Sequence, residues 1–294
     1  MALHIRGMGN PVWPDVLLRW LGHQRWLRYG VRRRVLTWLV DPAKAPDRPF
    51  EAQFAGFVYP GNLRRWIDWM VYFEGGYELD ELELMRTLMQ GRPEPIALDI
   101  GANVGHHTLY LASFCHQVHA FEPYDAVGRC IDEKIARNQL QHITVHRVGL
   151  GETDQELEYF APQGHNIGTG SFVPGHEASN NVLMGRLRLV HADPYLDALH
   201  LPRIDLIKID VEGFEMSVIR GLTNTLQRHR PVIVMELADA TRASFKTARE
   251  FLSHFPTGYR VDEVRSMRHH WGVLGRRGCV LVKPDFGAAA KPGH

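Results

Sequence analysis

The middle of the chain alternates short apolar runs with segments whose apolar residues recur every three or four positions. The runs lie at residues 96–100, 118–121, 144–148, 204–209 and 232–235. Short apolar runs are typical of buried strands, and the spacing between several of them is typical of amphipathic helices. Such alternation predicts a parallel sheet with right-handed crossovers and helices on both faces. We therefore expect a Rossmann-like α/β fold, with a terminal strand pair formed by the runs at 259–264 and 279–282.

The segments before and inside this alternation have weaker patterns. We expect short strands within residues 50–77, a turn at Tyr59–Asn62 and a helix over residues 78–90. The stretch from about Phe160 to Asp193 lacks periodicity and contains several glycines. We interpret it as a substrate-facing loop or lid, and a surface insertion is the alternative.

The first forty residues differ from the rest of the chain. Residues 16–40 have the pattern of one or two helices, with apolar residues on one face at Val16, Trp20, Leu27, Val31, Val35 and Trp38 and arginines interleaved. A basic amphipathic helix can lie on an anionic lipid surface, and a helix packed on the main domain is the alternative. We divide the chain into a helical extension with a linker (1–48), a catalytic domain (49–285) and a flexible tail (286–294).

Composition narrows the class of protein. The 294 residues are 45% hydrophobic and 23% charged, as in globular proteins, and neither a transmembrane segment nor a signal peptide is recognisable. We expect a cytoplasmic protein, with peripheral contact to the inner face of a membrane as an option. The net charge is +1, but residues 1–40 carry seven arginines and one acid, which leaves −5 for the remainder. No nucleic-acid partner is expected for the acidic main body.

The first chemical motif is a glycine loop. Leu98-Asp99-Ile100-Gly101-Ala102-Asn103-Val104-Gly105 follows an apolar run and precedes a helix that begins near His107. Glu122 ends the next run, 21 residues beyond Gly101. An acid at that spacing accepts hydrogen bonds from ribose hydroxyls in mononucleotide-type sites.

The loop chemistry bears on the choice of cofactor. A dinucleotide loop has three glycines, but Asn103 and His106 stand where the second and third would be. A carboxylate at Asp99 repels a pyrophosphate and suits a cationic amino-acid end. These features favour S-adenosylmethionine over NAD.

A second set of acids follows later runs. Asp210 and Glu212 come after the run at 204–209, and Glu236 follows the next run, so all three fall on the edge that carries the glycine loop. Asp210 and Glu212 are our candidates for a general base or for positioning an acceptor hydroxyl. Alternatives are Mg²⁺ held by Asp210 and Glu236, helix N-terminal roles for Glu212 and Glu215, and His165 as a weaker base candidate.

Taken together, these motifs resemble the FkbM family of methyltransferases. The matching segments are Leu98–Thr108, Ala120–Pro123, Ile204–Glu215 and Arg230–Glu236, and Tyr72–Leu79 is similar to the family's lead-in. The resemblance implies a seven-stranded class I methyltransferase sheet whose last strand is antiparallel. It implies that the cofactor's methionine end lies on the glycine loop, its ribose at Glu122 and its adenine near Gly149 and Leu150. The cofactor contacts that the resemblance implies are Asp99, Gly101, Ala102, Asn103, Gly105, Thr108, Glu122, Pro123, Gly149 and Leu150.

We therefore expect an S-adenosylmethionine-dependent O-methyltransferase. The resemblance implies a hydroxyl acceptor on a small molecule such as a saccharide, a glycolipid precursor or a related natural product. Two alternatives remain, an NAD-dependent oxidoreductase and an inactive cofactor-binding module that recruits partners through its basic N-terminus.

Overall fold

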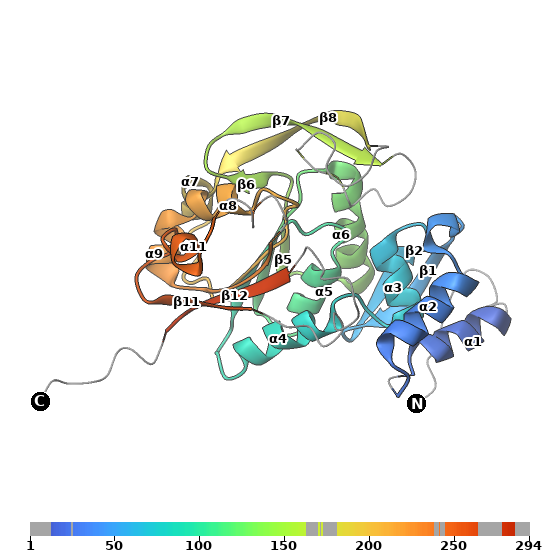
Figure 1. Ribbon diagram of the computed structural model, residues 1–294. Coiled ribbons are helices and arrows are strands. Elements are labelled where there is room, and N and C mark those ends of the chain that lie inside the picture. The colour runs from blue at the N-terminus through green and yellow to red at the C-terminus, as the bar shows by residue number, and fades with distance from the viewer. Residues whose placement is uncertain are drawn as a thin grey trace, which may run out of the picture.

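A seven-stranded sheet forms the centre of the protein (Figure 1). The computed structural model describes residues 13–24, 26–162, 170, 172, 181–237, 241, 245–263 and 278–285. The strands of the sheet, in spatial order, are β11 (Tyr259–Glu263), β12 (Gly278–Pro284), β10 (Val232–Leu237), β9 (Leu206–Ile209), β3 (Ile96–Ile100), β4 (Gln117–Phe121) and β5 (Ile143–His146). β12 runs antiparallel to both of its neighbours, and the pairs from β10 to β5 are parallel. The predicted Rossmann-like fold and its antiparallel last strand are confirmed.

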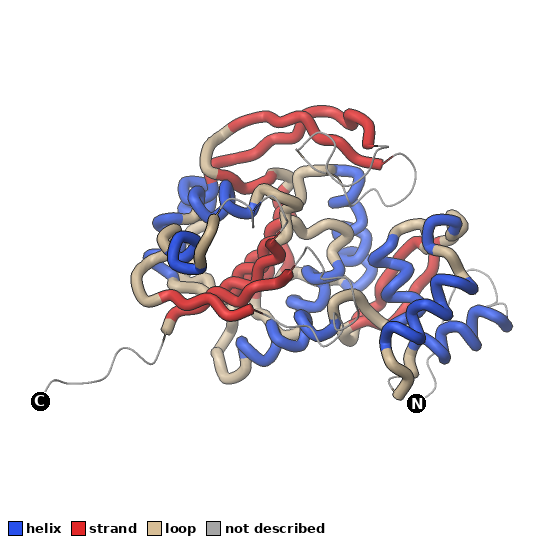
Figure 2. The backbone as a smooth tube through the Cα atoms, in the orientation of Figure 1, coloured by secondary structure: helices blue, strands red, loops and turns tan. Residues whose placement is uncertain are grey.

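Helices cover both faces of this sheet, as Figure 2 shows. One face carries α4 (Leu79–Met89), α5 (His106–Ala112) and α6 (Asp125–Asn138). The other carries α7 (Ala192–Asp197), α8 (Glu215–Gly221), α9 (Thr223–His229) and α11 (Ala248–Leu252). All five residues of β3 are buried. Ala97 belongs to the core on one face, and Leu98 and Ile100 belong to the core on the other. A strand buried on both faces reads as a continuous apolar run, which is why the sequence predicts β3 within its observed bounds.

A separate unit precedes the sheet. It consists of α1 (Trp13–Gly22), α2 (Tyr29–Leu39), a 3₁₀ turn η1 (Pro42–Lys44), the hairpin of β1 (Pro49–Phe54) and β2 (Phe57–Asn62), and α3 (Trp66–Glu74). The predicted turn at Tyr59–Asn62 is wrong, because these residues belong to β2. The chain reverses instead at Ala55 and Gly56, which both have positive φ, as a tight two-residue hairpin turn requires. Pro60 is tolerated in β2 because this two-stranded sheet has only edge strands.

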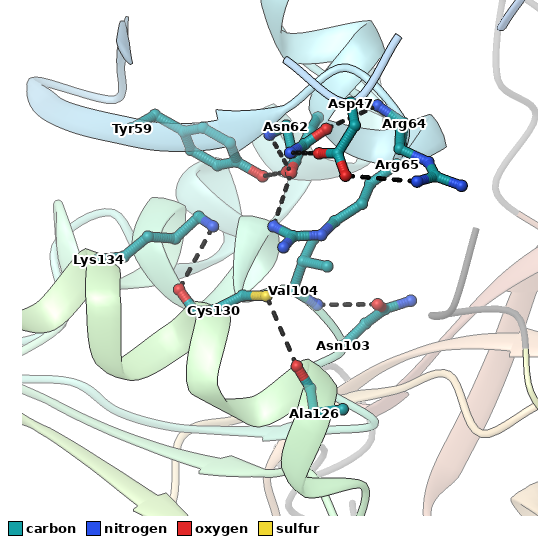
Figure 3. A network of polar contacts seen from close by, with 11 residues as sticks. Asp47, Tyr59, Asn62, Arg64, Arg65, Asn103, Val104, Ala126, Cys130 and Lys134 are labelled. Carbon is teal, nitrogen blue, oxygen red and sulfur yellow. Dashed lines mark hydrogen bonds and ion pairs between the residues drawn. The ribbon is translucent and has the colours of Figure 1, made fainter. Parts of the chain in front are cut away.

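A buried polar network at the hairpin and α3 joins this unit to α6 (Figure 3). Asp68 accepts hydrogen bonds from the Tyr59 hydroxyl at 2.6 Å and the Asn62 amide at 2.8 Å, and it pairs with Arg65 at 3.2 Å. The Lys134 ammonium of α6 lies 4.2 Å from the centre of the Tyr59 ring. A desolvated cation over an aromatic ring contributes stability, so the hairpin and α6 hold each other in place.

The region expected to be a loop between Phe160 and Asp193 is partly a ribbon of two strands. β7 (Gln155–Pro162) and β8 (Asn181–His191) pair antiparallel, and β6 (Gly149–Gly151) adds to β8 in parallel. The expectation of an aperiodic stretch is therefore wrong for these residues, while His165 lies outside the described residues. No helix within the described ranges is both long enough and apolar enough to cross a lipid bilayer.

Candidate functional site

The glycine loop joins β3 to α5 in a tight turn. Gly101, Asn103 and Gly105 all have positive φ, at 81°, 52° and 81°. A Cβ atom on Gly101 would lie 1.9 Å from the carbonyl oxygen of Asp210, so only glycine lets the loop pass the end of β9. The sequence of this loop is therefore dictated by how closely two strand ends approach each other.

Every backbone amide of this loop already has an acceptor. Gly101 and Ala102 donate to the carbonyl of Phe121 at 3.0 and 3.1 Å. The remaining donors and acceptors are Asn103 to Glu122 (2.9 Å), Val104 to the Asn103 side chain (2.8 Å) and Gly105 to Ala102 (2.9 Å). A pyrophosphate site needs amide N–H groups aimed at the ligand. This loop offers none from residues 101–105.

Glu122 stands at the end of β4 and faces a cavity. Its two carboxylate oxygens accept the amides of Asn103 and Tyr124, each at 2.9 Å. Burial raises the pKa of Glu122 to about 7, although these two hydrogen bonds oppose the shift. Each oxygen keeps a second lone pair, so Glu122 can accept hydrogen bonds from a bound diol as well.

The cavity beside Glu122 contains about 670 Å³ of atom-free space, including its open mouth. Eight of the predicted site residues line it: Gly101, Asn103, Glu122, Pro123, Gly149, Leu150, Asp210 and Glu212.

Four predicted residues support the loop without lining the cavity. Asp99 is fully buried and accepts a hydrogen bond from the Thr108 hydroxyl at 2.6 Å. Ala102 and Gly105 are linked by the hydrogen bond that closes the turn. Asp99 therefore contacts Thr108 and Lys208 of the protein, and these contacts hold the glycine loop in place.

Lys208 joins the two halves of the site from within β9. Its ammonium lies 3.5 Å from both Asp99 and Asp210 and donates to the Gly101 carbonyl at 3.2 Å. Burial by itself would lower the pKa of Lys208, but Asp210, Asp99 and other carboxylates outweigh burial and raise it. A lysine inside an apolar strand needs such partners. Lys208 holds the glycine loop against the end of β9.

Acidic side chains surround this lysine. Burial raises the pKa of Glu78 to about 8, of Glu81 to about 7 and of Glu236 to about 10, and the charge of Asp210 adds to each shift. Burial and then Asp210 raise the pKa of Glu212 to about 8. Glu212 also has a positive φ of 50°, which is uncommon for a residue with a side chain. These five acids form what we call the acidic rim.

Glu215 has a structural role. Its carboxylate accepts hydrogen bonds from the Gly213 amide at 2.8 Å and from the Thr241 hydroxyl, and it is buried at the start of α8. The described residues contain no group of three or more His, Cys, Asp or Glu side chains that could hold a metal ion.

Several residues of the site have no signal in the sequence pattern. They are six further lining residues of the cavity: Tyr159, Gly170, Phe172, Leu189, Val211 and Phe214. Ile100 and Phe121, the last residues of β3 and β4, line it as well. The rings of Tyr159 and Phe172 lie 5.6 Å apart, and those of Phe172 and Phe214 lie 5.5 Å apart. If β7 and β8 had been recognised as strands in the sequence, Tyr159 and Leu189 could have been predicted to line the cavity. Glu78 lies in the segment Tyr72–Leu79, which is similar to the lead-in of the family, so a place for Glu78 in the acidic rim could have been proposed from the sequence.

Comparison with known proteins assigns a family. The methyltransferase FkbM domain matches residues 99–261, which is more than half of the chain. A region of the AMB antimetabolite synthetase AmbE from Pseudomonas aeruginosa is 29% identical over 230 residues, which are 66% of this chain and only 11% of that protein. The hexuronic acid methyltransferase AglP from Haloferax volcanii is 28% identical over 203 residues, which are 68% of this chain and 80% of that protein.

Among solved structures, a methyltransferase FkbM from Methylobacillus flagellatus KT superposes with a TM-score of 0.45 and 14% identity, over 87% of this chain and 60% of that one. The length of the family match, together with the Rossmann-like sheet and its loop, confirms the resemblance found in the sequence. The chain belongs to the methyltransferase FkbM domain family.

Proposed function

We propose that the protein is an S-adenosylmethionine-dependent O-methyltransferase that acts on a hydroxyl of a small molecule. The observation that carries the proposal is the glycine loop whose amides are all occupied, beside a cavity lined by three carboxylates. Such a site disfavours a dianionic pyrophosphate and suits a cationic ligand. This chemistry argues for S-adenosylmethionine and against NAD.

The residues present fit the parts of this cofactor. Glu122 would accept hydrogen bonds from the ribose hydroxyls. Phe172 and Phe214, together with Leu150 and Leu189, give the cavity an apolar portion that suits a purine ring. When bound, the cofactor would supply a methyl group already activated by a positively charged sulfur. The protein must then hold an acceptor oxygen in line with that methyl and exclude water.

The carboxylates at the end of β9 are the groups that would remove the proton from the acceptor hydroxyl. Asp210 and Glu212 both line the cavity, and both lie on the segment that follows β9. A base works best when its pKa lies near the operating pH, which favours Glu212 with its pKa of about 8. In our proposal Glu212 accepts the proton of the acceptor hydroxyl, and Asp210 orients that hydroxyl while paired with Lys208.

The acidic rim bears on the acceptor. Asp210 and Glu212, the two rim acids that line the cavity, can accept hydrogen bonds from hydroxyls and so suit a saccharide or another polyol. A further negative charge beside Asp210 would add to the repulsion that already raises the pKa values of the rim glutamates. AglP is named for hexuronic acid, which is anionic, whereas the rim of this chain favours a neutral, hydroxyl-rich acceptor.

Calorimetry with S-adenosylhomocysteine and with NAD tests the cofactor. We expect binding of the first and none of the second. Replacing Glu122 with Gln should weaken S-adenosylhomocysteine binding about 10- to 100-fold, because hydrogen bonds to a charged group are worth roughly 1.5–3 kcal/mol. Glu158→Gln, at an exposed position on β7, is the matched control and should bind as the wild type does.

A methyl-transfer assay with neutral and anionic sugars then tests the activity. Binding without transfer to any hydroxyl acceptor would favour an inactive cofactor-binding module. Binding of NAD with no affinity for S-adenosylhomocysteine would overturn the proposal.

A further inference from the structure

Large apolar side chains are exposed in two places within the described part of the chain. One is small and consists of Leu183 and Met184 on β8. The other, which we call the N-terminal apolar face, consists of Val16, Leu17, Trp20, Trp26, Val31, Val35, Trp38 and Leu39. Its three tryptophans are 56%, 74% and 81% exposed. A group of large exposed apolar side chains on two helices that contact each other is typical of an interaction site.

The face is built into the helices that carry it. Along α2 the exposed positions 31, 34, 35, 38 and 39 have the spacing of a single helical stripe. The stripe points away from the protein, because the opposite side of α2 is already packed. There Leu36 is fully buried, and Arg32 is buried with its guanidinium 3.6 Å from Glu74. The exposed side of α2 is thus mostly apolar, whereas an ordinary surface helix exposes mostly polar residues.

α1 completes the surface beside α2. Val16, Leu17 and Trp20 of α1 are exposed, while Leu18 and Leu21 pack against the core. α1 and α2 contact each other, and both lie on the outer side of the N-terminal unit (Figure 1). Gly22 anchors the end of α1, since a Cβ there would lie 1.8 Å from the carbonyl oxygen of Phe73. The face is therefore held on a packed support.

The charges around the N-terminal apolar face indicate which kind of partner it binds. Arg28 and Arg34 are exposed among the apolar residues. Asp15 carries the only negative charge in residues 1–40, and it pairs with Arg48 at 2.6 Å. The rest of the chain carries a net charge of −5. Net charge therefore favours an anionic partner at the N-terminal segment over the rest of the chain.

We infer that α1 and α2 dock this enzyme on the surface of an anionic lipid bilayer. Tryptophans at the level of the headgroups, aliphatic side chains below them and arginines at the phosphates are the features of an interfacial helix pair. A second copy of the chain fits less well. A symmetric interface would bring Arg28 and Arg34 of both copies into one contact, where the only acid of residues 1–40, Asp15, is already paired with Arg48. Docking in this way would hold the catalytic cavity near acceptors carried by lipids, a consequence that rests on the proposed function.

Flotation of the full chain with lipid vesicles tests the inference. We expect co-flotation with phosphatidylcholine vesicles that contain phosphatidylglycerol, and much less with phosphatidylcholine alone. Trp20→Ser with Trp38→Ser should lower the partition coefficient at least about tenfold, because these side chains would lose their apolar environment. Leu183→Ser with Met184→Ser removes the other exposed apolar pair and should leave flotation unchanged.

Arg28→Gln with Arg34→Gln tests the electrostatic part. It should weaken binding to the anionic vesicles and reduce its dependence on salt, since exposed charges are screened by ions. Arg129→Gln with Arg228→Gln, at two exposed arginines of α6 and α9, is the charge-matched control. Unfolding temperature and S-adenosylhomocysteine affinity should stay at wild-type values in every variant.

Three results would overturn the inference. The first is wild-type protein that stays with the unbound fraction at low salt. The second is flotation that the tryptophan variant does not reduce. The third is a concentration-dependent dimer, seen by light scattering and abolished in that variant, which would assign the face to a second copy. Because cofactor affinity is measured separately, failure of docking is distinguishable from failure of the proposed function.

Discussion

Gly101 shows how one residue can determine the geometry of the whole site. It meets two separate demands: a φ of 81°, and an Asp210 carbonyl oxygen only 1.9 Å from where a Cβ atom would lie. Gly56 meets only the first, with a φ of 89° and open space where its Cβ would lie. Comparing these two glycines separates the cost of the backbone conformation from the cost of the collision.

We expect Gly56→Ala to lower the free energy of unfolding by about 1–2 kcal/mol, the usual cost of a left-handed conformation. Gly101→Ala should cost about 3 kcal/mol or more and should also weaken S-adenosylhomocysteine binding, because the loop and the end of β9 must move apart. Urea denaturation and calorimetry measure both effects. Equal losses of stability in the two variants would contradict the close approach.

The base can be identified from the pH dependence of turnover. With a pKa of about 8, Glu212 is mostly protonated at neutral pH and becomes a base as the pH rises. We expect kcat/KM for the acceptor to increase with pH and to level off above about 8. Glu212→Gln should abolish this rise of kcat/KM with pH and lower turnover about 100-fold or more. Its affinity for the cofactor should stay within a few-fold of the wild-type value.

Asp210→Asn is the comparison for that experiment. It should lower turnover but keep the pH limb, since Glu212 would still titrate. A limb that disappears in Asp210→Asn and persists in Glu212→Gln would transfer the role of base to Asp210.

The residues of the site were predictable where chemistry and spacing agreed. Glu122 and Gly101 were found because an acid and a glycine at the ends of adjacent parallel strands are typical of a nucleotide-type site. Tyr159 and Phe172 were missed because an aromatic residue has no signature until its strand has been placed. The sequence could not distinguish residues that line the cavity from residues such as Asp99 that hold the loop, because that depends on which way each side chain points.

At the scale of elements, β7 and β8 bring an apolar wall to a site otherwise made of strand ends. Phe172, between these strands in the sequence, contacts Tyr159 of β7 and Phe214 after β9. We expect Phe172→Ala to weaken cofactor binding about tenfold and to leave the unfolding temperature nearly unchanged, because Phe172 is only partly buried. Calorimetry and a thermal melt measure these effects.

Leu183→Ala, at an exposed position near the start of β8, controls for a general effect on the ribbon. The same loss of affinity in both variants would show that the stability of the ribbon matters, and not the contact of one ring with the ligand.

The elements that the sequence predicted well are those buried on both faces. β3, β4, β9 and β10 lie inside the sheet, so their residues form apolar runs regardless of side-chain direction. β8 is largely exposed, and β2 contains Pro60 and Gly61, so neither has an apolar run to detect. α3 is buried over most of its length, which removes the polar face that would have identified a helix.

For the whole molecule, the acidic rim couples stability to pH. Glu236, Glu78 and Glu212 have pKa values of about 10, 8 and 8, against about 4.3 for an unfolded glutamate. Above the unfolded value the native state therefore keeps protons that the unfolded chain has lost. Under that condition the free energy of unfolding falls as the pH rises, and the contribution is gone once the pH exceeds the folded values.

We expect the ligand-free protein to lose stability between about pH 7 and 9, by up to roughly 1.4 kcal/mol per pH unit for each proton of difference. Lys208 stays charged between pH 7 and 9 because its pKa is raised. The pKa values of His106 and His107 are lowered, so these two residues change charge only below this pH range. None of the three therefore alters how the free energy of unfolding depends on pH between 7 and 9. Glu236→Gln cannot ionise and should flatten the decline, whereas the exposed Glu158→Gln should not. Urea unfolding at several pH values measures the slopes. Parallel slopes for wild type and Glu236→Gln would show that Glu236 is ionised in the native protein throughout this range.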